Sequence, residues 1–187
     1  MDAFEQLVGN LLGSEGYWVK RSIKVALTKE DKALIGRKSS PRWEIDVVAY
    51  HATQNRLLVI ECKSYLDSGG VHAAHFDAGS RYAHRYKLFH EPVLRETVLA
   101  RLKQQCVAEG YCPADADISL GLAYGHGTRH NDALIRDHFN ANGWLLFGPD
   151  WSHTHLQRMA TGSYENSMAA IVAKLLLRSP GPLCETA

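Results

Sequence analysis

Cysteine and long apolar runs are both scarce in this sequence of 187 residues. The four cysteines, at positions 62, 106, 112 and 184, form no CxxC pair and no cysteine-histidine zinc pattern, so we expect reduced thiols rather than a disulfide scaffold. No stretch approaches the roughly 20 apolar residues of a membrane-spanning helix, and the acidic N-terminal stretch is unlike a signal peptide. These absences predict a cytoplasmic protein with no membrane partner.

A large net charge is also missing. Lys and Arg total 21 and Asp and Glu total 20, which gives a net charge of +1. Phosphate binding depends on where Lys and Arg gather, so this balance neither requires nor excludes a nucleic-acid partner. Repeats and low-complexity segments are absent, and the length suits a single domain. We expect that domain over residues 1–178 and a proline-containing tail at 179–187.

The spacing of apolar residues predicts alternating helices and strands. We expect strands at 17–27, 43–50, 57–63, 118–124 and 144–148. Helices are expected at 2–12, after Gly70 with Tyr82, Tyr86 and Phe89 on one side, from Pro92 past Cys106, at 131–142, and through 168–176. This order predicts an α/β fold in which helices flank both faces of a mixed central sheet.

Charged residues inside two apolar strands are the first indication of a site. If the hairpin between RWEIDVVAY (42–50) and LLVIECKSY (57–65) closes about Thr53 and Gln54, Tyr50 faces Leu57 and Asp46 lies opposite Glu61. Strand alternation then places these charges together on one face: Glu44, Asp46, Glu61 and Lys63. The other face takes Ile45, Val47, Ile60 and Cys62.

Opposed carboxylates repel each other unless a cation lies between them, and apolar neighbours cover this face. A divalent cation between Asp46 and Glu61 would remove the repulsion. Hard cations such as Mg²⁺ prefer carboxylate oxygens, with water and substrate phosphate as further ligands. Lys63, about 7 Å farther along the strand, could orient the attacking water and offset negative charge. The pattern therefore predicts phosphate chemistry.

An acid, a hairpin and then E-x-K, present as Asp46 and Glu61-Cys62-Lys63, resemble the PD-(D/E)XK nuclease superfamily. The proline that precedes the aspartate in that family is Ile45 here. The resemblance covers residues 2–124, with 131–148 as an extension, and implies a restriction endonuclease-like core similar to the Holliday-junction resolvase-like or Mrr-like branch. It also implies a Mg²⁺-dependent deoxyribonuclease that accepts Mn²⁺, with Asp46, Glu61 and the Cys62 carbonyl as metal ligands and Lys63 as a catalytic residue.

Four further residues are candidates for this site. The family often places a supporting acid on its first helix, where Glu5 lies, although the helix dipole alone also favours an acid in a first turn. Arg81, Tyr82 and Arg85 could lie along a phosphate backbone if they share a helix face, and an ordinary solvated helix face is the alternative. Glu44 is expected to be a solvated charge at the start of a strand.

Several other interpretations remain open. Asp46, Glu61 and Lys63 could form an exposed hairpin face with a weak cross-strand ion pair. The chain could be a non-catalytic nucleic-acid-binding or assembly module, or it could cleave RNA. The expected partner is DNA, a homodimer would supply the two sites that duplex cutting needs, and a partner protein could provide sequence specificity. His72 and His75 are close enough for a transition-metal site, but such spacing arises by chance among ten histidines.

Overall fold

The structure, a computed structural model, describes residues 2–37 and 43–177. Its five strands form one sheet in the order β1-β2-β3-β4-β5. The strands are β1 (Trp18–Val25), β2 (Trp43–His51), β3 (Arg56–Lys63), β4 (Asp117–Tyr124) and β5 (Leu145–Phe147). Neighbours are antiparallel from β1 to β3 and parallel from β3 to β5, which confirms the predicted mixed sheet of an α/β fold. The predicted tail at 179–187 lies outside the described residues.

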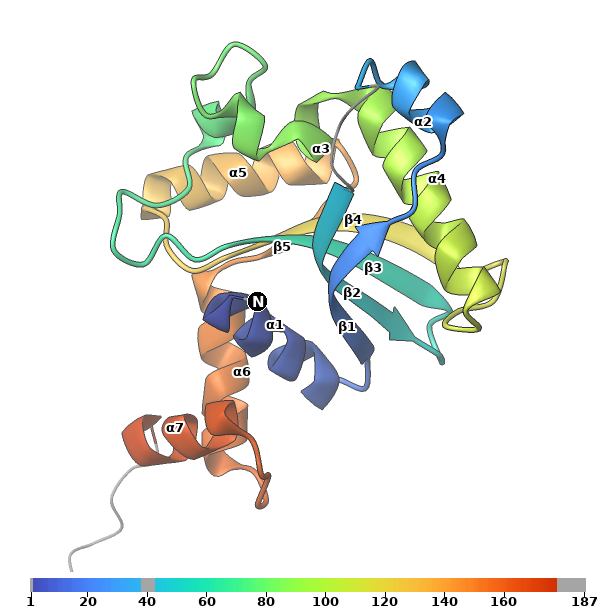
Figure 1. Cartoon of the computed structure of the whole chain (residues 1–187). Helices are drawn as coiled ribbons and strands as arrows, with labels where there is room; N and C mark the ends of the chain where they lie inside the picture. Colours follow the sequence, from blue (N-terminus) through green and yellow to red (C-terminus); the bar gives the residue numbers. More distant parts are fainter. Residues whose placement is uncertain (1, 38–42, 178–187) are drawn as a thin grey trace, which may run out of the picture.

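Helices cover both faces of this sheet, as predicted (Figure 1). On one face α1 (Ala3–Ser14) packs against the strands and against α6 (Pro149–Thr161), which in turn contacts α7 (Met168–Leu177). The other face carries α3 (Lys87–His90), α4 (Pro92–Ala108) and α5 (Arg129–Ala141), and the short α2 (Lys29–Leu34) follows β1. In the described parts of the chain, no helix combines the length and the apolar character needed to cross a membrane.

The helix predictions were wrong in three places. Both α2 and α6 were missed; α6 begins directly after β5, where Gly148 is the N-cap and Pro149 the first helical residue. The predicted helical stretch after Gly70 is instead two 3₁₀ turns, η1 (Ala73–Phe76) and η2 (Ala83–Arg85), followed by the one-turn helix α3. The Asp-Ala-Gly-Ser segment at 77–80 separates the two turns, because Gly, Ser and Asp favour turns over helix interiors.

The hairpin between β2 and β3 has the predicted register. Tyr50 pairs with Leu57 and Val47 with Ile60, around a turn over residues 52–55. This pairing ends at Val47, so the next residue, Asp46, has no partner residue in the β3 ladder. The hairpin therefore brings Asp46 to the end of β3 that carries Glu61.

The ladder between β1 and β2 is interrupted opposite the same residue. It omits the pair Ser22 and Asp46, and Ser22 has a left-handed backbone with φ of 51°. The interruption shifts the alternation of β2, so that Val47 packs beside α1 while Ile45 joins Val48 in the core of the opposite face. The prediction that Ile45 and Val47 share a face was therefore wrong. By the same alternation the Glu44 side chain lies on the face of the sheet opposite to Glu61, and it is exposed.

Candidate functional site

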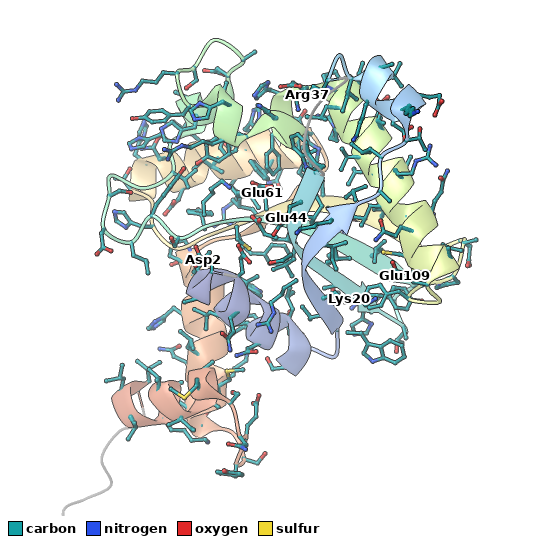
Figure 2. All side chains as sticks on the ribbon, viewed as in Figure 1. Asp2, Lys20, Arg37, Glu44, Glu61 and Glu109 are labelled. Atoms are coloured by element: carbon teal, nitrogen blue, oxygen red, sulfur yellow. The ribbon has the colours of Figure 1, made fainter. Side chains whose placement is uncertain are left out.

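Glu61 and Lys63 form an ion pair at the C-terminal end of β3. Lys63 Nζ donates to Glu61 Oε1 at 2.6 Å, and the two side chains are only 17% and 19% exposed. Figure 2 shows Glu61 near the middle of the fold, far from the Lys20–Glu109 ion pair beside β1. Lys63 thus folds back onto Glu61 instead of extending along the strand. The pair lies within one strand and is mostly buried, unlike the alternative of an exposed cross-strand pair.

Asp46 lies beside this pair, at the point where the β1–β2 ladder is interrupted and the β2–β3 ladder ends. Its Oδ2 accepts a hydrogen bond of 2.7 Å from the backbone amide of Cys62, which ties β2 to β3 beyond the last ladder pair. Burial, together with the charge of Glu61, raises the pKa of Asp46 to about 6, although the Cys62 amide and Lys63 act in the opposite direction. The negative charge of Asp46 is therefore only partly compensated by the protein.

Glu5 approaches the same site from the first turn of α1. Burial raises its pKa, and the negative charge of Asp46 raises it further. Glu5 also belongs to the capping box of α1, in which the Asp2 side chain accepts from the Phe4 amide and Glu5 Oε2 faces the Asp2 amide at 3.5 Å. The fold thus brings Glu5 within electrostatic range of Asp46 and gives it a capping role at the same time.

Two substitutions of Glu5 are expected to separate these roles. Glu5→Gln keeps the capping box, because Gln is also a capping residue at this position, but it removes the charge that acts on Asp46. We expect a melting temperature for Glu5→Gln that is at least that of the wild type, because burial and Asp46 disfavour the charge of Glu5. For Glu5→Ala we expect a loss of about 1 kcal/mol of stability. If Glu5 also supports catalysis, both variants lose cleavage rate. Full activity in Glu5→Gln would restrict Glu5 to the helix cap.

A pocket of about 350 Å³ opens over Glu61 and Lys63. Among the described residues that line it, cationic side chains outnumber acidic ones, because Lys63, Arg85 and Lys87 line it together with Glu61. The remaining lining residues are mostly aromatic or apolar: Trp43, Tyr65, His84, Tyr86, Leu88 and Phe89. Trp43 Nε1 and the Tyr86 hydroxyl are buried and have no hydrogen-bond partner among the described residues. Cations and free donors together suit a ligand with anionic oxygens.

The three predicted substrate-binding residues lie in the connection between β3 and α4. They do not share a helix face, because Arg85 is the last residue of the three-residue 3₁₀ turn η2, Tyr82 is its N-cap and Arg81 precedes it. Arg85 lines the pocket of Glu61 and Lys63, and its Nη1 donates to the Tyr65 hydroxyl at 3.1 Å. Arg81 and Tyr82 line a second hollow that adjoins this pocket. The structure therefore places one of the three at the site and two beside it.

Several residues of the pocket wall were not predicted from the sequence. Tyr65 lies two residues beyond Lys63, so an aromatic residue just past the end of the motif strand was an available signal. Trp43 and Lys87 come from the start of β2 and from α3, and no local pattern connects either of them with Glu61. Their contribution depends on how the long connection between β3 and β4 folds back over the sheet.

A divalent cation would find hard oxygen ligands here. Asp46 and Glu61 provide two carboxylates. Burial and, after it, the charge of Glu61 raise the pKa of Asp46, and a bound cation would offset both effects. Within residues 2–37 and 43–177, no cluster of three or more His, Cys, Asp or Glu residues is arranged to hold a metal ion. The predicted ligand set contains only two acidic side chains and one backbone carbonyl. It therefore has fewer side-chain ligands than a cluster of three, and the absence of such a cluster does not bear on it.

The ring nitrogens of His72 take part in protein hydrogen bonds. Nε2 lies 3.0 Å from the Gly69 carbonyl oxygen, and Nδ1 lies 3.0 Å from Asn131 Nδ2. His75 Nδ1 lies 3.3 Å from the His72 amide. These bonds favour a structural role over a transition-metal site at the two histidines.

No model of a known protein family matches the chain, and no curated protein matches it. The PD-(D/E)XK resemblance therefore rests on the motif residues and on the order of the elements that carry them.

Proposed function

We propose that this protein is a metal-dependent endonuclease that hydrolyses DNA phosphodiester bonds. One observation carries the proposal: the fold holds Asp46 close to Glu61 in a mostly buried position, beside a pocket with excess positive charge. Holding two like charges together is unfavourable for a purely structural site. The arrangement is useful where a cation and a phosphate complete it.

Mg²⁺ is the proposed cofactor, and Mn²⁺ should substitute for it. Asp46 and Glu61 would bind the ion, and the resemblance adds the Cys62 carbonyl. When bound, such an ion polarises the scissile phosphate and lowers the pKa of a coordinated water molecule. The restriction endonuclease-like fold and the superfamily membership are part of this same proposal.

The side chains of the chain itself have separate roles in this proposal. Lys63, held by Glu61, would orient the attacking water and offset negative charge as the phosphorus gains an oxygen ligand. Arg85 and Lys87 would hold the flanking phosphates as cations of the pocket wall. Trp43 Nε1 would donate to a phosphate oxygen, because it is a buried donor that lacks a partner in the described chain.

The test is a cleavage assay with the purified protein. Supercoiled plasmid, linear duplex, branched DNA, single-stranded DNA and RNA are incubated with Mg²⁺ or Mn²⁺, and parallel samples contain EDTA. We expect metal-dependent cutting of at least one DNA substrate. Nicked and linear plasmid products would distinguish cutting by one site from cutting by two, the second supplied by another copy of the chain. DNA binding without any cutting would replace the proposal by a non-catalytic binding module.

A further inference from the structure

The hollow beside the Glu61–Lys63 pocket has its own composition. It measures about 600 Å³ and shares Tyr65 and Arg85 with that pocket. Its ring-bearing and cationic lining residues are Tyr65, His72, His75, Arg81, Tyr82 and Arg85, and the rest of the lining is Ser, Gly and Ala. Of the residues that the structure describes, none with a carboxylate side chain lines the hollow. It is therefore both aromatic and cationic, and it adjoins the proposed catalytic pocket at the two shared residues, Tyr65 and Arg85.

The rings and guanidinium groups of this hollow are arranged alternately. The Arg85 guanidinium lies 5.9 Å from the ring centroids of both Tyr65 and Tyr82. Arg81 lies 4.6 Å from the centroid of Tyr82 and donates to its hydroxyl at 2.6 Å. The ring of His75 lies 4.5 Å from that of Tyr82. These contacts hold flat surfaces next to positive charges.

The two guanidinium groups remain available to a ligand. In the portion of the chain that the structure describes, neither Arg81 nor Arg85 forms an ion pair with a carboxylate, and both residues are exposed. Burial lowers the pKa of His75, and the nearby His72, Arg81 and Arg85 lower it further, which favours the neutral form of the ring. His75 therefore adds a flat ring to the hollow rather than a further charge.

The backbone around the hollow is held in unusual conformations. Tyr65 has φ of 45°, which is unfavourable for a bulky residue and is retained only where the surroundings enforce it. Gly70 has φ of 79°, and a Cβ atom there would lie 2.7 Å from the His126 carbonyl oxygen. The adjoining bridge between Val71 and Gly127 fixes this loop to the segment after β4. These contacts hold the backbone of the wall in a defined conformation.

We infer that this hollow binds one unpaired nucleotide of the substrate, with its base against Tyr65 and Tyr82 and its phosphate on Arg81 and Arg85. Bases stack on aromatic rings and guanidinium planes where they are not already stacked inside a duplex. The inference rests on the proposed function, because the shared residues place this nucleotide next to the phosphate that is cut. It specifies the substrate class as single-stranded DNA or DNA with unpaired bases beside the scissile bond.

Binding in EDTA tests the inference without cleavage. The fluorescence anisotropy of a labelled single strand and of the same strand in a duplex is measured with the wild type and with Tyr82→Ala, Tyr82→Leu and Tyr82→Phe. We expect tighter binding of the single strand by the wild type, and a loss of roughly 5- to 150-fold when the ring is removed. Tyr82→Phe should keep most of the affinity because it keeps the ring.

Tyr82→Leu retains an apolar side chain where Tyr82 packs against the core, so it provides the test if Tyr82→Ala unfolds. Arg81→Gln is expected to weaken single-strand binding and to reduce its salt dependence. Equal binding of duplex and single strand, or unchanged affinity in Tyr82→Leu, would overturn the inference.

Cleavage of the same two DNAs in Mg²⁺ separates this inference from the proposed function. Ring-dependent binding of single strands without cutting would leave the nucleotide site standing and refute the nuclease. Efficient cutting of fully paired duplex that does not depend on Tyr82 would support the nuclease and refute the nucleotide site.

Discussion

Replacing Lys63 with alanine is expected to reduce metal-dependent cleavage by about 10²- to 10⁴-fold. The Lys63 amine is largely buried and is fixed at 2.6 Å from Glu61. In the Lys63→Ala variant a mobile lysine on the protein surface would not reach this position. Although burial alone would lower the pKa of Lys63, the charge of Glu61 and its hydrogen bond raise that pKa overall. The amine is therefore positively charged at every pH at which the assay is run, and its loss removes a fixed charge next to the scissile phosphate.

The control for Lys63 is Lys20, which forms an exposed ion pair with Glu109 at 3.0 Å beside β1. Lys20→Ala removes the same charge from the protein but should leave cleavage unchanged. Lys63→Gln preserves a hydrogen-bond donor to Glu61, so it shows whether lost activity comes from lost charge rather than from misfolding. Single-strand binding in EDTA should persist in both Lys63 variants. Near wild-type cleavage by Lys63→Ala would exclude the proposed role.

Replacing Asp46 with asparagine is expected to abolish cleavage and at the same time to stabilise the protein at pH 7.5. Asn keeps the shape of the side chain, and its amide oxygen can still accept from the Cys62 amide. What disappears is a mostly buried charge beside Glu61. Loss of activity with a gain of stability is the signature of a residue kept for its chemistry.

The pH dependence of this stabilisation follows from the pKa of Asp46. Burial and the charge of Glu61 raise that pKa to about 6 from an ordinary value of 3.8, so between these two values the folded state binds more protons than the unfolded state. Stability therefore falls as the pH rises through this window, and above it the ionised Asp46 costs on the order of 2–3 kcal/mol. For Asp46→Asn we expect a melting temperature several degrees higher at pH 7.5 and little difference at pH 4.

Asp137, an exposed acid on α5, provides the matched control. Asp137→Asn should change stability by less than about 0.5 kcal/mol at either pH. Saturating Mg²⁺ should raise the melting temperature of the wild type and of Asp137→Asn, but not that of Asp46→Asn, because only the last variant lacks a metal-binding carboxylate. A lower melting temperature of Asp46→Asn at pH 7.5 would contradict the assignment.

The sequence predicted the hairpin well because two local signals agree there. A short polar turn and the alternation of apolar residues both require Tyr50 to face Leu57, and the structure has that pair. The prediction from side-chain alternation was wrong from one residue beyond this ladder. Ser22 adopts a left-handed backbone there, and no sequence pattern in β1 predicts it. The faces of Ile45 and Glu44 were therefore predicted incorrectly, although every strand was located.

The candidate site was predictable only in the part that the hairpin carries. Asp46, Glu61 and Lys63 are brought together by one turn, and their order along the chain identified them. Tyr65 and Tyr86 lie in the connection between β3 and β4, and their place in the pocket depends on tertiary packing over the sheet. The ion pair between Lys63 and Glu61 depends on the conformation of both side chains, which strand alternation does not specify.

The short hairpin turn also has a consequence for the entropy of the site. Asp46 and Glu61 are joined through the turn at residues 52–55, whereas the parallel pairing of β3 with β4 must close the whole segment from 64 to 116. The entropic cost of closing a loop grows with the logarithm of its length. Closing the short turn therefore costs about 2 kcal/mol less than closing the long connection. The strand pairing that holds the two repelling acids together, β2 with β3, thus has the lowest loop-closure cost in the sheet. The aromatic wall of the site lies in the connection between β3 and β4, whose closure has the highest cost.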